Sequence, residues 1–405
     1  MNRQLLLIFA LSGSLCSAGI LLAQPNAAVP EPFQGHDPAS TYTINYEDLD
    51  AMLKASVIDV GRSTRKKAEP VPATTGTRMK SSVKRATVNE GNRFRFEAFA
   101  EDDDLRALLG EMRKSLQNIP AQAPLELFSR DEQLAYWLNL YNVTLLDEIV
   151  AIYPERSLKK FLTGKKSILA KKILTVAGIE LSLDDIQHTI LGQNYDRDPL
   201  IMYGLYQGVI GGPNIRKRAY TGENVYRNLA DNAAEFVNSN RGSEAGRTSV
   251  FHVSNLYERN AACFPDFQAD LSEHLMAFVT GYEREALKTA GKIKPDISDW
   301  SVTDLYGSYR DVGGSFATNK AAMLDAVQAS TMVDYQVIST NFSDPSGMVI
   351  GKAPGPSRFS PELLAHLTEI KMKEEAAYIE KGGTVTVEEL GQAPEPANPE
   401  LRQEQ

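Results

Sequence analysis

The sequence is poor in cysteine, because only two of its 405 residues, Cys16 and Cys263, carry a thiol. If the first leaves with an N-terminal signal segment, no internal disulfide can form. Cys263 has no base nearby in the sequence, so we interpret it as a small core residue. No pair of cysteines or of the five histidines has the spacing of zinc ligands, and we expect neither a metal nor another cofactor.

Long apolar runs are absent after the first 23 residues, so we expect no stable membrane span in the mature chain. Residues 1–23 combine a basic start at Arg3, an apolar run and the small residue Ala23, as in a secretory signal peptide. We therefore predict cleavage after Ala23 and export to the periplasm or the extracellular space. A retained anchor and a lipoprotein at Cys16 are the alternatives, although Leu15 is bulky for a lipidation site.

The chain also lacks an excess of positive charge, since 43 Lys and Arg face 52 Asp and Glu for a net charge of −9. Removing residues 1–23 takes away Arg3 and makes it −10. Such a protein is a poor generic binder of nucleic acid, so we expect a protein or another envelope ligand as partner. Ten basic residues gather in 62–95. This insertion is either a solvated, partly flexible segment or a docking strip for an anionic partner.

Apolar residues make up 42% of the chain, which is enough for a core without a metal or disulfide. The strongest predicted helix covers 129–153. Ser129 and Glu132 form a capping box, Trp137 and Tyr141 lie on its apolar stripe, and Pro154 ends it. We interpret Trp137 as a core anchor. Further helices are predicted at 46–60, 182–191, 224–238 and 271–287, a hairpin at 171–181, and strands at 250–253 and 298–302.

These elements predict a helix-rich α+β domain with a small antiparallel sheet. We place a linker at 24–40, the domain at 41–310, a helical extension at 311–380 and a disordered acidic tail at 381–405. The tail is rich in proline and nearly free of large apolar residues, so it cannot offset the entropy of ordering.

Two pairs of polar residues and one glycine-rich run are candidates for chemistry. Asp184 precedes His188 by four residues, so a carboxylate could orient an imidazole that acts as a base; a structural role is the alternative. Asn139 and Asn142 lie beside the apolar stripe of the long helix, where they either bond loop backbone or orient a substrate amide. The glycine-rich run 208–213 lacks the lysine of a phosphate-binding loop and indicates a tight turn.

The chain resembles the family called domain of unknown function 547. The resemblance extends from about Tyr46 to Ser301 and rests on YWLNLYN at 136–142 and SLDDIQH at 182–188. Shorter support comes from Asp198-Pro199 and from DWS at 299–301. It implies a helix-rich α+β fold with a distant relation to papain-like or transglutaminase-like folds.

The departures from the family fall where chemistry would occur. In the segment LYQGVIGGP at 205–213, the family usually carries cysteines where this chain has Gln207 and Gly212. Leu200 and Met202 replace a usual arginine and histidine. Gly208 remains. Without the thiol that could attack a carbonyl, the same catalysis is not expected. The chain therefore resembles a divergent, catalytically silent member.

Two functions remain open. One is an exported, non-catalytic binding or envelope-associated protein. The other is a hydrolase or acyl-transferase with a rewired site built from His188, Asp184 and Gln207. An open cleft lined by His188 and Gln207 would leave the enzyme possible, whereas a filled one favours binding alone.

Overall fold

The computed structural model describes residues 28–65, 87, 90–246, 249–305 and 386–389. The predicted signal peptide and the helical extension at 311–380 lie outside these residues. The α-helices of the described part are α1 Glu47–Ser56, α2 Phe96–Glu101, α3 Asp103–Gln117, α4 Ile119–Gln122, α5 Arg130–Ile152, α6 Lys159–Leu162, α7 Gly192–Asn194, α8 Val225–Val237, α9 Asn255–Arg259, α10 Phe267–Phe278 and α11 Gly281–Lys288. Shorter helical turns are η1 Glu31–Phe33, η2 Leu125–Leu127, η3 Ile168–Ala170, η5 Pro199–Tyr203 and η6 Ala261–Cys263, and η4 Asp185–Leu191 is a π-helix.

The strands of the described residues are short and form four separate sheets. They are β1 Tyr42–Asn45, β2 Val57–Ile58, β3 Arg93–Phe94, β4 Leu174–Val176, β5 Ile179–Leu181, β6 Ser243–Ala245, β7 Val250–Ser254, β8 Lys292–Ile297 and β9 Thr386–Glu389. The pairs β1–β9, β2–β3 and β4–β5 are antiparallel, whereas β7 pairs antiparallel with β6 and parallel with β8. The predicted α+β class is confirmed, and the largest of these sheets is mixed.

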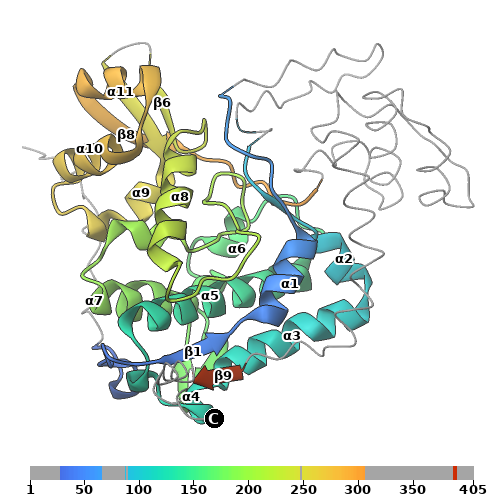
Figure 1. Cartoon of the computed structure of the whole chain (residues 1–405). Coiled ribbons are helices and arrows are strands. Elements are labelled where there is room, and N and C mark those ends of the chain that lie inside the picture. The colour runs from blue at the N-terminus through green and yellow to red at the C-terminus, as the bar shows by residue number, and fades with distance from the viewer. Residues whose placement is uncertain (1–27, 66–86, 88–89, 247–248, 306–385, 390–405) are drawn as a thin grey trace, which may run out of the picture.

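Helix α5 crosses the centre of the molecule in Figure 1, with α3 packed along it. As predicted, Ser129 caps it by accepting a hydrogen bond from the Glu132 backbone N–H at 3.2 Å, and it ends before Tyr153-Pro154. Only half of the capping box forms. The Glu132 carboxylate accepts instead from the backbone N–H groups of Ile44 and Gly222, at 3.1 and 2.8 Å. It therefore joins the helix start to two distant segments.

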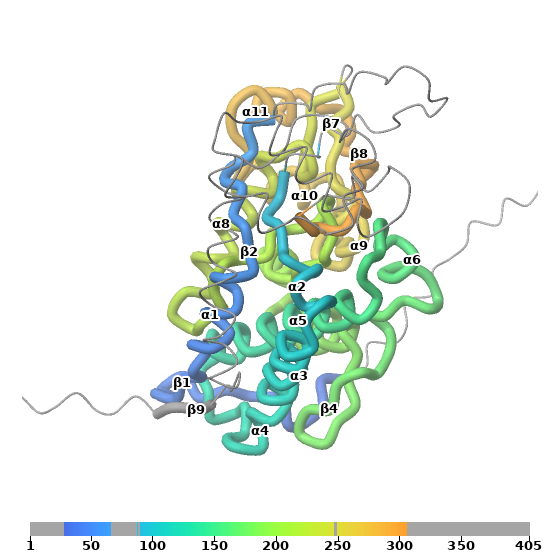
Figure 2. The backbone as a smooth tube through the Cα atoms, turned by 90° about the vertical axis from the view of Figure 1, so that its right-hand side faces the viewer, coloured from blue at the N-terminus to red at the C-terminus, as the bar shows by residue number. Residues whose placement is uncertain are grey.

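Two hydrophobic clusters make up the core of the part of the chain that the structure describes. The larger surrounds α5 and contains Trp137, and the smaller lies among α9, α10, α11 and the β6–β7–β8 sheet. Figure 2 shows the second group at the top of the molecule and α3 and α5 below it. Helix α8 joins the two, because Leu229 packs in the larger cluster and Phe236 in the smaller. Helix α8 therefore holds the two halves together.

The smaller cluster departs from the sequence prediction in two places. A single helix was expected at 271–287, but Val279 is extended and Gly281 has a φ of +64°, so α10 and α11 are separate. Tyr282 lies on the predicted helix at 271–287, where its spacing from Leu275 and Val279 predicts an inward position, but it is 73% exposed after this break. The predicted strand at 298–302 is also wrong. That segment makes isolated bridges at Ser301 and Val302, and the strand is β8 just before it.

The predicted linker before the domain and the predicted tail near the end of the sequence both contain structure that was not expected. Residues 28–40 were expected to be a linker, yet Phe33 is buried and its ring meets Trp137 edge-on at 5.0 Å. Within the expected disordered tail, β9 pairs with β1, as seen at the bottom of Figure 1. The rest of that tail lies outside the described residues. The proline-rich composition of 28–40 predicted a linker. Composition alone does not show where a single aromatic ring packs, so it could not predict the burial of Phe33.

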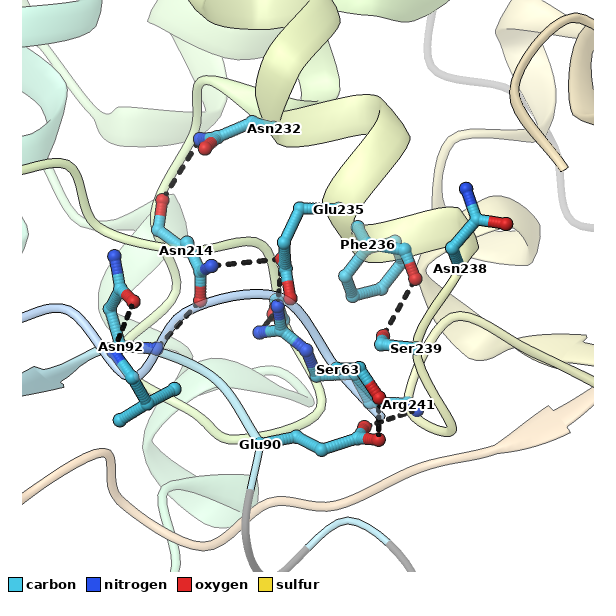
Figure 3. Close-up of polar contacts among 12 residues, drawn as sticks. Ser63, Glu90, Asn92, Asn214, Asn232, Glu235, Phe236, Asn238, Ser239 and Arg241 are labelled. Carbon is cyan, nitrogen blue, oxygen red and sulfur yellow. Dashed lines mark hydrogen bonds and ion pairs between the residues drawn. The ribbon is translucent and has the colours of Figure 1, made fainter. Parts of the chain in front are cut away.

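The two ends of the basic insertion at 62–95 are held close together on the turn after α8. On one side, the Arg65 guanidinium donates to the Ser243 carbonyl at 2.6 Å. On the other, the Glu90 carboxylate accepts from the backbone N–H groups of Asn240 and Arg241, at 3.0 and 3.1 Å. Figure 3 shows the Glu90 side of this network, where Ser63 also donates to the Glu90 carboxylate. The segment 66–86 between the ends lies outside the described residues.

Candidate functional site

The loop that follows η5 is packed tightly into the protein. A Cβ on Gly208 would lie 2.2 Å from the Ile149 side chain, and its φ of +69° also favours glycine. The backbone N–H groups of Ile210 and Gly211 donate to the carbonyls of Ser301 and Asp299, both at 2.8 Å. The expected tight turn is thus a docked turn, fixed against the last described segment of the domain.

Helix α5 positions this loop through its two asparagines. Asn142 donates to the Gly204 carbonyl and accepts from the Tyr206 backbone N–H, both at 2.9 Å. Asn139 makes the same two-point contact with the backbone of Tyr220, at 2.8 and 3.0 Å. Each amide uses both its N–H donor and its oxygen acceptor to bond loop backbone, which is a structural role. The residue after Tyr206, Gln207, is therefore held in a defined place.

Gln207 is buried, and its amide oxygen accepts a hydrogen bond from the Arg259 guanidinium at 2.7 Å. The guanidinium carbon lies 5.1 Å from the centre of the Trp300 ring, a cation–π distance. Gly212, the second position where the resemblance implies a cysteine, is 3.3 Å from the Gln207 Cβ if given a Cβ of its own. The place expected to hold a nucleophile is thus filled by an amide, and an arginine covers it.

Tyr141 and the η4 segment complete the surroundings of Arg259. Burial raises the pKa of Tyr141, with a further rise from Asp184 and an opposing effect of Arg259, so both charges act on this hydroxyl. Next to Arg259, the Asn260 side chain accepts a hydrogen bond from Gln187 at 2.8 Å. Tyr141 belongs to the larger core cluster, whereas α9 packs in the smaller one. The site therefore lies where the two halves of the core meet.

Asp184 and His188 face the same side, but they do not form a hydrogen-bonded pair. The Nε2–Oδ1 distance is 3.9 Å, and the histidine side chain is 52% exposed. Burial raises the pKa of Asp184, and His188 opposes that rise. Within the described part of the chain, Asp184 is the polar contact of His188, and no hydroxyl or thiol is bonded to the ring. The imidazole has no nucleophile to activate there.

The other candidate residues have structural surroundings. Trp137 is completely buried, and Asp198 caps η5 by accepting from the Leu200 backbone N–H at 2.9 Å. Cys263 lies beside the smaller cluster, and burial raises the pKa of its thiol to about 11, so little thiolate exists at neutral pH. Among the described residues, no group of three or more His, Cys, Asp or Glu side chains could hold a metal ion. The same part of the chain contains no helix of sufficient length and apolarity to span a membrane.

Residues 125–237 match the family model described as a protein of unknown function, DUF547, and this part of the chain belongs to that family. No curated protein and no solved structure matches the chain. Tyr141, His188 and Gln207 lie inside the matched region, whereas Arg259 and Trp300 lie beyond it. The relation to papain-like folds stays a prediction.

Sequence reasoning missed Arg259. It lies at the end of a short helix with no recognisable pattern around it, and its role appears only when α9 is folded against Gln207. Trp300 was noted in the sequence as part of DWS at 299–301, but as a strand residue. Its position beside a guanidinium depends on the docked turn and has no local signal.

Proposed function

We propose that the chain is an exported, non-catalytic binding protein of the cell envelope or the extracellular space, with its ligand site around Arg259. The observation that carries this proposal is the contact between Gln207 and Arg259 at the position where a family cysteine is expected. An amide cannot become the thiolate that attacks a carbonyl. The largely buried guanidinium of Arg259, in contrast, is suited to hydrogen-bonding a ligand.

A rewired hydrolase or acyl-transferase is the second candidate, because the side chains of Asp184 and His188 lie on the same side, 3.9 Å apart. A general base needs a group within hydrogen-bond reach to deprotonate, and His188 has none among the described residues. Only a water or a substrate hydroxyl could take that place. This candidate therefore depends on a ligand that itself supplies the nucleophile.

Catalytic silence is tested with the full chain and panels of chromogenic esters, thioesters and peptide amides. We expect no turnover above buffer for the wild type, for His188→Ala or for Cys263→Ser. Iodoacetamide should label Cys263 roughly a hundredfold more slowly than a free thiol at pH 7, since its pKa is about 11. Turnover that disappears in His188→Ala supports the second candidate. Turnover that disappears as iodoacetamide rapidly labels Cys263 overturns the proposal that the domain is catalytically silent.

Export has its own test, because it rests on residues 1–23 alone. We expect the protein recovered from the envelope or the medium to begin at Gln24, as determined by mass analysis of its N-terminal peptide. The variant Ala23→Trp should be cleaved more slowly, since signal peptidase sites need a small residue there. Recovery of the chain with an intact Met1 from the cytosol contradicts the proposed location.

A further inference from the structure

Arg259 is largely buried, and no carboxylate among the described residues pairs with it. Its single hydrogen bond within the described residues runs to the neutral amide of Gln207, and its Nε is buried without any acceptor. A guanidinium carries five N–H donors, so most of them have no acceptor in the described part of the chain. Burial accordingly lowers the pKa of Arg259. A desolvated charge without a counter-charge is costly, and an anionic ligand would supply the missing partner.

The surroundings hold this guanidinium ready for a ligand. Gln207 fixes one end of the planar group, and the half-buried Trp300 ring supports its face. The Tyr141 hydroxyl makes no hydrogen bond to the described residues, and it lies within electrostatic reach of Arg259. His188, more than half exposed, lies on the neighbouring η4 segment. Free donors and a partly exposed aromatic ring thus come together at one place.

We propose that Arg259, with the Tyr141 hydroxyl and the Trp300 ring, forms a subsite for the carboxylate of a ligand. This inference deepens the proposed binding function and rests on it. A planar carboxylate matches the fork of a guanidinium, and an apolar or aromatic body can lie along the indole. The negative charge of Asp184, which acts on Tyr141, repels a phosphate dianion more strongly than a singly charged carboxylate.

The test uses benzoate as the probe and the whole chain labelled with 5-fluorotryptophan. The chain has two tryptophans, so fluorine NMR gives one signal from Trp300 and one from the buried Trp137, which serves as an internal control. We expect benzoate to shift the Trp300 signal saturably and to leave Trp137 in place. Benzamide, its neutral isostere, should give no saturable shift, and phosphate at equal ionic strength should bind more weakly.

Variants of Arg259 then locate the charge. We expect Arg259→Met to weaken benzoate binding by roughly tenfold or more, as for loss of charged hydrogen bonds, and Arg259→Lys to have an intermediate effect. An unchanged Trp137 signal shows that a variant has folded. If Arg259→Met does not fold, the comparison of benzoate with benzamide on the wild type still decides whether the subsite requires a carboxylate.

Equal shifts with benzamide, or full benzoate binding by folded Arg259→Met, overturn the carboxylate subsite. Tighter binding of phosphate overturns the choice of ligand. Neither result bears on catalytic silence, which depends on turnover, so the two proposals fail by different measurements.

Discussion

Trp137→Ala is expected to lower the free energy of unfolding by about 3–5 kcal/mol, the range for emptying a large aromatic core site. The indole is completely buried, with Phe33 edge-on at 5.0 Å and Tyr136 at 4.9 Å. The cavity left by the substitution adds to the lost apolar contact because neighbours on α5 cannot collapse into it. Urea unfolding followed by circular dichroism gives the change, with the midpoint lowered and the slope unchanged.

The matched control is Tyr282→Ala, at a residue that is 73% exposed. It should change the free energy by less than about 0.5 kcal/mol. Trp137→Phe should cost less than the alanine variant, because it keeps an aromatic ring and removes an indole N–H that has no acceptor among the described residues. Equal stability of Trp137→Ala and the wild type contradicts the assignment of Trp137 as a core anchor.

The elements that the sequence predicted well carry their signals locally. Helix α5 has its cap at Ser129, its apolar stripe and its stop at Pro154 within one stretch of chain. The β4–β5 hairpin is similar, since Ala177 and Gly178 both adopt positive φ at its turn. The helix forms even though distant contacts at Ile44 and Gly222 take the Glu132 half of its capping box, because the Ser129 cap, the apolar stripe and the Pro154 stop remain.

The elements that were missed depend on distant contacts. Phe33 is in the core because its ring packs edge-on against Trp137, and no sequence pattern near Phe33 predicts this contact. Strand β8 contains Pro295 and alternates charged with apolar residues, yet it forms because β7 offers a parallel edge. Arg259 is the same kind of case at the candidate site. The sequence placed Gln207 in an unusual loop, but which side chain would cover it was a tertiary question.

Arg241 gives the second large effect, because it is the buried cation of the network that holds the basic insertion. Its side chain is fully buried, pairs with Glu235 and donates to the Gly212 carbonyl at 2.8 Å. Its guanidinium also lies 5.3 Å from the centre of the Phe236 ring. Figure 3 shows Asn214 donating to the same Glu235 carboxylate, at 2.8 Å. The pair thus connects α8 with the loop of the candidate site.

We expect Arg241→Met to lower the free energy of unfolding by about 3–5 kcal/mol at pH 7, because it leaves Glu235 buried without a cation. Burial raises the pKa of Glu235 and Arg241 opposes that rise, so the variant should raise it further. A carboxyl with a raised folded-state pKa destabilises the fold above that pKa and ceases to do so once protonated. The deficit of the variant should therefore shrink as the pH falls from 7 toward 5.

Glu235→Gln supplies the partner for a double-mutant cycle. Since the double variant has no buried charge in this pair, its loss should be at least about 1 kcal/mol smaller than the sum of the single losses. Lys288→Met is the control, because Lys288 and Glu285 form an exposed pair whose removal should cost less than about 0.5 kcal/mol. Strictly additive losses, or a deficit independent of pH, would show that Arg241 acts through packing and its bond to Gly212. A strong coupling would instead mean that the Arg241–Glu235 pair stabilises both the two ends of the basic insertion and the Gly212 end of the loop at the candidate site.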